Sequence, residues 1–236
     1  MTTTTSTSRR SSSSRPGVRI RCSTRSDGDF HPSHGDPSRR DELRRRLVDL
    51  PWTVLDQRHG TEVVRVPQPG AGDGMIGDIA ITDRTDAVLG CWVADCAPVV
   101  LIGNDRELAV AHAGWRGLAG GVIDAAVDAM TEPVDAALLG PTIGPCCYEF
   151  GADDLAAVAA GVGSSAIAGR TTDGRPALDV PRAVAAALGR RGIALEPIAS
   201  TGCTGCAYDG FSHRIRSDTA RHVVAVWQST PDVEGS

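Results

Sequence analysis

Three residues of the types that bind transition metals lie at the edges of apolar runs in this sequence. Cys96 precedes the run APVVLIG, His112 lies inside ELAVAHA, and His59 lies between two short apolar segments. A buried polar side chain costs free energy unless it is paired or binds a metal. Two imidazoles and one thiolate form a zinc ligand set with a fourth position open for water or substrate. The separations match no local ligand motif, so core histidines and an inert thiol remain the alternative.

The same region of the sequence is open to other chemistry. Cys96 could act as a nucleophile activated by His112, as in a cysteine hydrolase. Arg116, in GWRG, could hold an anion at a helix N-terminus or pair with an acid such as Asp95. Asp95 itself could orient a metal ligand or cap a turn. Arg214, in FSHRIR, could contact phosphate or substrate, or lie on the surface.

The other cysteines carry a weaker signal. Seven cysteines in 236 residues with no export signal indicate free thiols rather than a disulfide framework. The pair CTGC, Cys203 and Cys206, has the spacing of a redox dithiol or of half a zinc site. No second CxxC completes such a site, so we expect local packing for this pair and a structural role for Cys146 and Cys147. His31 and His34 are expected in loops, with no partner nearby in sequence. His213 and His222 are expected to have structural roles.

The composition excludes several function classes. A net charge of −5 and an aromatic content of 4% give no basis for nucleic-acid binding. All 24 basic residues are arginine, which excludes a Schiff-base lysine, a Walker-A lysine and a Ser-Lys dyad. No segment resembles a signal peptide or is apolar and long enough to span a membrane comfortably. We therefore expect a cytoplasmic protein with no membrane partner.

The chain is expected to form one domain with a tail at each end. A hydrophobic content of 41% is enough for the core of one large domain, which we place over residues 17–228. Residues 1–16 are rich in Ser, Thr and Arg and unable to bury apolar surface, so a disordered tail is expected there. Residues 229–236 are expected to form a flexible tail.

Apolar periodicity predicts a sheet in the middle of the chain, followed by helices. Helices are expected over Asp41–Leu50, over Leu118–Met130 after a turn at Gly114–Gly117, and in ADDLAAVAAG and LDVPRAVAAALGRRG. WTVLDQRHGTEVVRV predicts two short strands around a turn at His59-Gly60, and RTTDGRP a flexible loop. Further strands are expected in IAIT, DAVLGCWVAD, APVVLIG, ELAVAHA, AALLG and RHVVAVWQ.

Five motifs together resemble one protein family. QRHGTEVV, ADCAPVVL, AVAHAGWRGLAGGVI, GPTIGPCCYEFG and FSHR occur in this order and are similar to the YfiH family, once called multicopper polyphenol oxidases or laccase-domain proteins. The resemblance runs from about Val54 to Trp227. It implies a single α/β domain of layered mixed β-sheets flanked by helices, similar to the catalytic domain of bacterial deamidating toxins and to a cysteine hydrolase fold.

The resemblance also implies a site and an activity. The metal ligands carried over are His59 from QxHG, Cys96 from ADC and His112 from AHAGWRG, with zinc as the expected metal and copper as the alternative. Family members are described as purine nucleoside enzymes that phosphorolyse adenosine, inosine, guanosine or methylthioadenosine and deaminate adenosine. The implied partners are a nucleoside and phosphate, bound by a monomer. Residues expected in catalysis are Cys96, His112, Arg116 and Arg214, and those expected to contact substrate are Asp95, Arg116 and Arg214.

The chain departs from the family pattern at three places. The stretch between RCSTRSDGDF and HGDPSRRDELRRRL is shortened, and Arg58 replaces a common small apolar residue. The usual tyrosine-arginine-arginine run appears as SHRIRSDTAR, with Arg214 as the best match and Arg221 as a remnant. These changes bear on substrate preference and leave the metal triad intact.

Two other function classes stay open beside the purine nucleoside enzyme. A copper-dependent phenol oxidase is disfavoured, because a multicopper site needs more histidines than the six in this chain. A hydrolase acting on cell-wall precursors, in peptidoglycan editing, is the other alternative.

Overall fold

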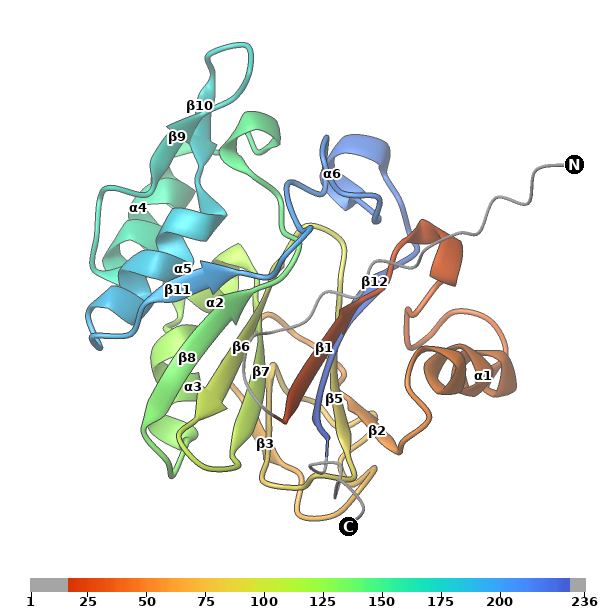
Figure 1. The fold of residues 1–236 in the computed structure, drawn as a ribbon. Coiled ribbons are helices and arrows are strands. Elements are labelled where there is room, and N and C mark those ends of the chain that lie inside the picture. Colours follow the sequence, from red (N-terminus) through yellow and green to blue (C-terminus); the bar gives the residue numbers. More distant parts are fainter. Residues whose placement is uncertain (1–16, 230–236) are drawn as a thin grey trace, which may run out of the picture.

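The structure, a computed structural model, describes residues 17–229. The predicted tails 1–16 and 229–236 lie outside these residues, except for Ser229, whose hydroxyl donates to the Gly17 carbonyl at 3.2 Å. The described residues form four layers, helix, sheet, sheet and helices, as Figure 1 shows. The expected mixed α/β domain is therefore confirmed.

The smaller sheet has four strands in the order β1-β12-β5-β2. Strand β12 (His222–Gln228) pairs antiparallel with β1 (Val18–Cys22) on one side and with β5 (Val88–Val93) on the other. Strand β2 (Trp52–Val54) runs parallel to β5 at the edge. The two ends of the described chain thus lie side by side within one sheet.

The larger sheet has six strands in the order β11-β8-β6-β7-β4-β3. Its centre consists of β6 (Ala97–Gly103), β7 (Leu108–Ala113) and β4 (Ile79–Thr82), every residue of which is buried. Continuous apolar runs of this kind are typical of strands covered on both faces. The outer strands are β3 (Val63–Arg65), β8 (Val134–Leu139) and β11 (Leu195–Pro197).

Apolar side chains of the two sheets pack against each other, including Leu89 and Val226 from the smaller sheet and Val100 and Val110 from the larger one. The opposite face of the larger sheet is covered by four helices, α2 (Trp115–Ala119), α3 (Val122–Ala129), α4 (Ala152–Val162) and α5 (Val180–Gly189). Helix α1 (Pro37–Leu47) lies on the outer side of the smaller sheet, where Leu47 packs with Trp52.

Short elements extend from this frame. Strands β9 (Ala168–Arg170) and β10 (Pro176–Leu178) form an antiparallel hairpin, so the expected flexible loop RTTDGRP is the turn of a hairpin. The remaining short elements are the one-turn helix α6 (His213–Arg216) and two 3₁₀ helices, η1 (Arg25–Asp27) and η2 (Pro145–Cys147).

Two helix predictions were wrong in their boundaries. The first helix begins at Pro37, because the Asp36 side chain accepts a hydrogen bond from the Ser38 N–H and caps it, and it ends at Leu47 rather than Leu50. The single helix expected over Leu118–Met130 is two helices, α2 and α3. Gly121, with a left-handed φ of 85°, interrupts the helical backbone between them.

Candidate functional site

Residues distant in sequence meet at one end of the larger sheet. Strands β3, β4 and β6 begin at this end, whereas β7, β8 and β11 finish there, as their pairing shows. Cys96 immediately precedes β6, and His112 is the second-last residue of β7. His59 lies in the segment between β2 and β3. Strands β2 and β3 are both present as predicted, but they belong to different sheets.

The predicted metal triad is assembled at this end. One donor atom each of His59, Cys96 and His112 lies within 4.8 Å of the other two. The Cys96 Sγ atom is 3.8 Å from His59 Nε2. The two imidazole rings meet edge to face, with their centroids 4.8 Å apart. His112 is buried, Cys96 half-buried and His59 exposed, so the group opens to solvent on the His59 side.

Asp78, immediately before β4, holds both histidines. Its Oδ1 atom accepts hydrogen bonds from His112 Nδ1 at 2.8 Å and from the His59 backbone N–H at 2.9 Å. Its Oδ2 atom accepts the backbone N–H groups of Arg58 and Gly60. These bonds support the left-handed backbone of His59, whose φ is 61°. Asp78 was not predicted from the sequence, although an acidic residue between a glycine-rich loop and an apolar strand is a signal for such a role.

Gln57 and Gly114 shape the approach of the ligands. The Gln57 side-chain amide donates to the Trp92 carbonyl and accepts the Trp92 N–H, which ties the segment before His59 to β5. A Cβ atom at Gly114 would lie 2.6 Å from His59 Cδ2 and 3.2 Å from Cys96 Sγ. The absence of a side chain at Gly114 therefore lets the triad close.

The thiol and the buried imidazole perturb each other. Burial disfavours charge on Cys96, but the field of His112 and hydrogen bonds with His112 and His59 outweigh it and lower the pKa of Cys96 to about 6. Burial likewise disfavours the imidazolium, but the Cys96 thiolate and the Asp78 carboxylate raise the pKa of His112 to about 9. Without a metal, this geometry favours a thiolate and imidazolium pair at neutral pH. By contrast, burial raises the pKa of Cys91 well above its ordinary value, which keeps that thiol inert.

The triad also fits a transition-metal ion. Cysteine sulfur and histidine nitrogen are the donors that zinc and copper prefer. His112 donates its Nδ1 proton to a carboxylate, the contact that commonly orients metal-binding histidines, so its Nε2 atom is free to act as a donor. Three protein donors with an open side match the ligand count of catalytic zinc sites.

Asp95 lies beside the triad in a tight turn, with a φ of 97° that is unusual for a residue with a side chain. Its Oδ1 atom accepts the Thr204 hydroxyl at 2.6 Å, and its Oδ2 atom accepts the Arg214 backbone N–H at 2.7 Å. Its carbonyl accepts the Thr142 hydroxyl. Asp95 therefore joins three loops, and its carboxylate is already engaged by protein donors.

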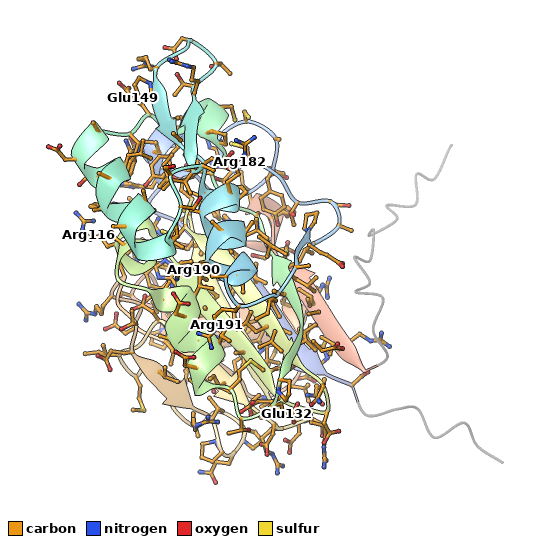
Figure 2. All side chains as sticks on the ribbon, turned by 90° about the vertical axis from the view of Figure 1, so that its left-hand side faces the viewer. Arg116, Glu132, Glu149, Arg182, Arg190 and Arg191 are labelled. Atoms are coloured by element: carbon orange, nitrogen blue, oxygen red, sulfur yellow. The ribbon has the colours of Figure 1, made fainter. Side chains whose placement is uncertain are left out.

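The two candidate arginines lie on different elements. The exposed Arg214, in α6, places its guanidinium 4.7 Å from the centre of the Tyr148 ring. Arg116, the second residue of α2, is also exposed and stacks 4.3 Å above the ring of Trp115. Figure 2 shows Arg116 on the helical face of the molecule. Asp95 bonds Thr204 and Arg214 rather than Arg116, and α2 is too short to offer a developed dipole.

The two loop histidines, His31 and His34, were expected to have no partner nearby in sequence. His34 Nδ1 lies 2.9 Å from Asp29 Oδ2, so a partner does occur nearby in sequence. The rings of His31 and His34 stack with centroids 3.8 Å apart, and His31 contacts Trp92, which in turn stacks on His112. His31, His34 and Trp92 thus form a row of ring contacts that ends at the buried His112.

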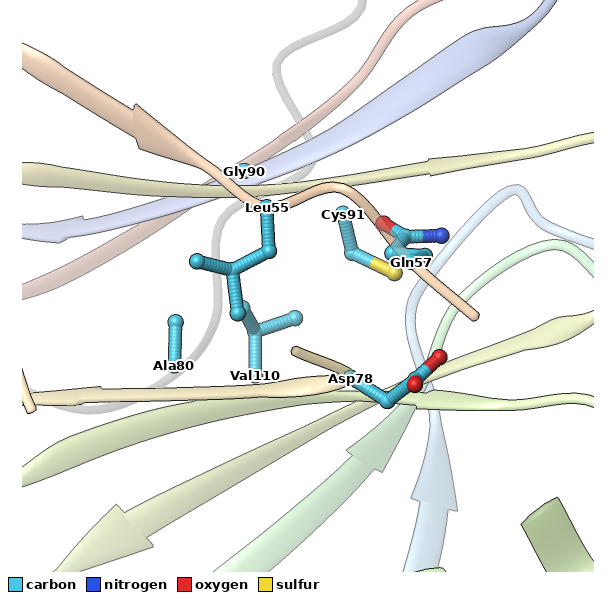
Figure 3. Close-up of a pocket in the computed structure, with 7 residues that line it drawn as sticks. All are labelled: Leu55, Gln57, Asp78, Ala80, Gly90, Cys91 and Val110. Atoms are coloured by element: carbon cyan, nitrogen blue, oxygen red, sulfur yellow. The ribbon is translucent and has the colours of Figure 1, made fainter. Parts of the chain in front are cut away.

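A small cavity lies behind the triad, between the two sheets. It is lined by Leu55, Gln57, Asp78, Ala80, Gly90, Cys91 and Val110 (Figure 3). Its size is close to that of one water molecule, so it cannot hold a nucleoside. The triad is open to solvent on the side of the exposed His59.

The fold and the site define a single-domain α/β protein with a histidine and cysteine metal-binding group at one end of its larger sheet. A family described as multi-copper polyphenol oxidoreductase laccase matches residues 29–229. The chain belongs to this family, the YfiH family, as its motifs predicted.

Relatives and solved structures agree with this assignment. The chain is 34% identical over 211 residues to a Pseudomonas aeruginosa protein named purine nucleoside phosphorylase PA4543, with 81% of each chain covered. It is 37% identical over 184 residues to the Streptomyces coelicolor protein named purine nucleoside phosphorylase SCO2081, with 73% of each covered. The crystal structure of Neisseria meningitidis protein NMB0706 superposes with a TM-score of 0.79 at 27% identity, covering 91% of this chain and 95% of that one.

Among the helices of residues 17–229, none is both long and apolar enough to cross a membrane.

Proposed function

We propose that this protein is a purine nucleoside phosphorylase that also deaminates adenosine. The proposed substrates of phosphorolysis are adenosine, inosine, guanosine and methylthioadenosine, and the protein is proposed to act as a cytoplasmic monomer. The observation that carries the proposal is the cluster of His59, Cys96 and His112, held by Asp78. Relatives named purine nucleoside phosphorylase supply the reaction class.

In phosphorolysis, phosphate attacks the anomeric carbon of the ribose, the bond to the purine nitrogen breaks, and the base leaves as sugar 1-phosphate forms. The residues must hold a polyanion and stabilise the charge that develops on both reactants. Arg214 is suited to hold phosphate, since its backbone is fixed by Asp95 and its guanidinium is exposed over Tyr148. Arg116, the exposed second residue of α2, is a second proposed phosphate contact. In the proposed phosphorolysis, Asp95 acts as a positioning residue for Arg214.

Asp78 and His112 control where a proton sits in the site. The Asp78 carboxylate accepts the Nδ1 proton of His112, which leaves Nε2 to bind the metal or, without a metal, to share a proton with Cys96. A zinc or copper ion held by His59, Cys96 and His112 would supply the Lewis acidity that activates water for deamination. The burial of His112 limits the access of bulk water to this part of the site.

A hydrolase acting on cell-wall precursors is the second candidate. The order Cys96, His112 and Asp78 follows the logic of nucleophile, base and orienting carboxylate. The exposed His59 is an additional ligand that such a triad does not need. A copper-dependent phenol oxidase is disfavoured, because within residues 17–229 only two groups of candidate metal ligands occur and just one contains histidine.

Product analysis tests the proposal. Purified protein is incubated with inosine or adenosine, with and without phosphate, and with and without a chelator, and the products are separated by chromatography. We expect phosphate-dependent release of hypoxanthine from inosine and conversion of adenosine to inosine, both abolished in Cys96→Ser. Cys22→Ser is the matched control, since Cys22 is a thiol of β1 outside the triad. No purine product, together with cleavage of a cell-wall precursor, would favour the hydrolase instead.

A further inference from the structure

Two loops that follow strands of the larger sheet bring four cysteines together. Cys146 and Cys147 belong to the 3₁₀ helix η2 after β8, and Cys203 and Cys206 belong to the loop after β11. One Sγ atom from each lies within 4.8 Å of the other three. The Sγ atoms of Cys146 and Cys206 are 3.7 Å apart. Local packing was expected for the CTGC pair because the sequence does not show that Cys146 and Cys147 lie beside it.

This spacing is that of a single tetrahedral ion. With zinc–sulfur bonds of about 2.3 Å, the edge of a tetrahedron of thiolates is about 3.8 Å. The separation of Cys146 and Cys206 matches that edge, and contacts up to 4.8 Å can contract to it by small side-chain rotations. A core of several iron and sulfide ions would hold the four thiolates farther apart.

The backbone around the cysteines is shaped for their close approach. A Cβ atom at Gly205 would lie 2.8 Å from Cys147 Cβ and 2.9 Å from Cys147 Sγ, so only glycine fits between Cys203 and Cys206 at this position. Cys203 Sγ accepts a hydrogen bond from the Gly144 N–H at 3.2 Å. Such N–H donors stabilise negative charge on a thiolate.

We propose that Cys146, Cys147, Cys203 and Cys206 bind one zinc ion in a closed structural site, distinct from the His59, Cys96 and His112 triad. The CTGC pair is half of this site, and the adjacent cysteines of η2 are the other half. Binding displaces the thiol protons and leaves four thiolates on one Zn²⁺, a net double negative charge. Arg216 lies close enough to offset part of it, since its guanidinium donates to the carbonyls of Thr204 and Gly205.

The zinc ion would lock the loops that position the substrate arginine. Thr204, between the two cysteines of CTGC, donates its hydroxyl to Asp95, which holds the Arg214 backbone. Thr142, four residues before Cys146, donates to the Asp95 carbonyl, and its own carbonyl accepts the Thr204 N–H. The ion joins the same two loops from the outside. Its role is therefore to stabilise folding and the placement of Asp95, and it has no open position for chemistry.

Zinc content of purified variants tests the site without reference to activity. We expect Cys203→Ser and Cys206→Ser each to hold one zinc ion per chain fewer than wild type, measured by elemental analysis after dialysis. Cys96→Ser, changed at the triad, is expected to keep the four-cysteine ion, and Cys22→Ser to keep the wild-type content. Because Cys206 lies at the exposed edge of the group, its variant keeps the test valid if Cys203→Ser fails to fold. The result is independent of the proposed phosphorylase function.

Two measurements guard against other occupants. Cobalt-substituted wild-type protein should show the intense visible bands of a tetrahedral tetrathiolate site, and these should vanish in Cys206→Ser and persist in Cys96→Ser. Alkylation of the unfolded wild-type protein with chelator but no reductant should modify all seven cysteines. Wild-type zinc content in Cys206→Ser, iron in place of zinc, or a disulfide between Cys146 and Cys206 in protein purified anaerobically would each overturn the proposal.

Discussion

His112 Nδ1 lies 2.8 Å from Asp78 Oδ1, in a buried hydrogen bond between the end of β7 and the start of β4. The same carboxylate accepts the backbone N–H groups of residues 58–60, which carry the exposed ligand His59. Burial disfavours ionisation of Asp78, but the hydrogen bonds from His112 and the backbone hold its pKa below the ordinary value. One buried carboxylate therefore couples a ligand on a rigid strand to a ligand on a loop.

We expect Asp78→Asn to weaken zinc binding at the His59, Cys96 and His112 triad by about 10- to 100-fold, the usual effect of losing the carboxylate behind a histidine ligand. The amide has a single acceptor oxygen for the donors that Asp78 satisfies, so the free energy of unfolding should fall by about 1–3 kcal/mol. Competition titration with a chromophoric chelator and urea unfolding measure the two effects. Asp86→Asn, in the exposed pair with Arg84, should change neither. Unchanged zinc affinity in Asp78→Asn would show that His112 is not held as a ligand.

Gly114→Ala should damage the triad and spare the fold. The backbone at Gly114, with φ of −75° and ψ of 165°, suits any residue, but the new Cβ would meet His59 at 2.6 Å. His59 is exposed and can swing outward, so we expect zinc affinity to fall by about 10-fold or more and the unfolding midpoint to change little. Gly189→Ala is the matched control, because nothing lies within 4 Å of the added Cβ. Equal zinc affinity of the triad in Gly114→Ala and Gly189→Ala would exclude His59 as a ligand.

The sequence was most informative where one strong pattern dominated. The fully buried strands β6 and β7 are apolar apart from His112, and both were predicted within a residue of their bounds. The ligand triad was found through motifs, since His59, Cys96 and His112 have no common spacing. Weak local signals failed, as with β11 (Leu195–Pro197), whose three residues are held by parallel pairing to β8 and were not predicted.

Contacts between distant segments account for the rest. Asp78 is 34 residues from His112, and Thr204 is 109 residues from Asp95, so no local pattern relates them. The four-cysteine group escaped notice for the same reason: Cys146 and Cys206 are 60 residues apart and meet only because β8 and β11 run parallel and end together.

His222 predicts a specific acid sensitivity. Burial, with smaller contributions from the Arg221 and Arg216 charges, lowers the pKa of His222 to about 3 from an ordinary 6.5. The unfolded chain therefore binds one more proton than the native protein between these values, and stability is lost as the pH falls from 6.5 toward 3, by about 1.4 kcal/mol per pH unit.

The variant that tests this is His222→Gln, in which an amide oxygen can still accept the Phe211 N–H that His222 Nδ1 now accepts. Urea unfolding from pH 7 to pH 4 should give a shallower loss of stability for the variant, by a slope equivalent to about one proton. Parallel curves for wild type and His222→Gln would show that His222 is not buried in its neutral form.

Separate substitutions of the two exposed arginines distinguish phosphate binding from other roles. If Arg214 and Arg116 hold phosphate by charge-assisted hydrogen bonds, replacing either with alanine should remove roughly 2–4 kcal/mol of transition-state stabilisation from phosphorolysis. The measurement is kcat/KM for phosphate-dependent release of hypoxanthine from inosine. Conversion of adenosine to inosine uses water and should suffer less.

Both side chains are exposed, so folding and zinc content should hardly change. Arg182→Ala, on the surface of α5, is the control. Equal losses in the two reactions would mean that the arginine positions the nucleoside, and the phosphate assignment would be abandoned for that residue.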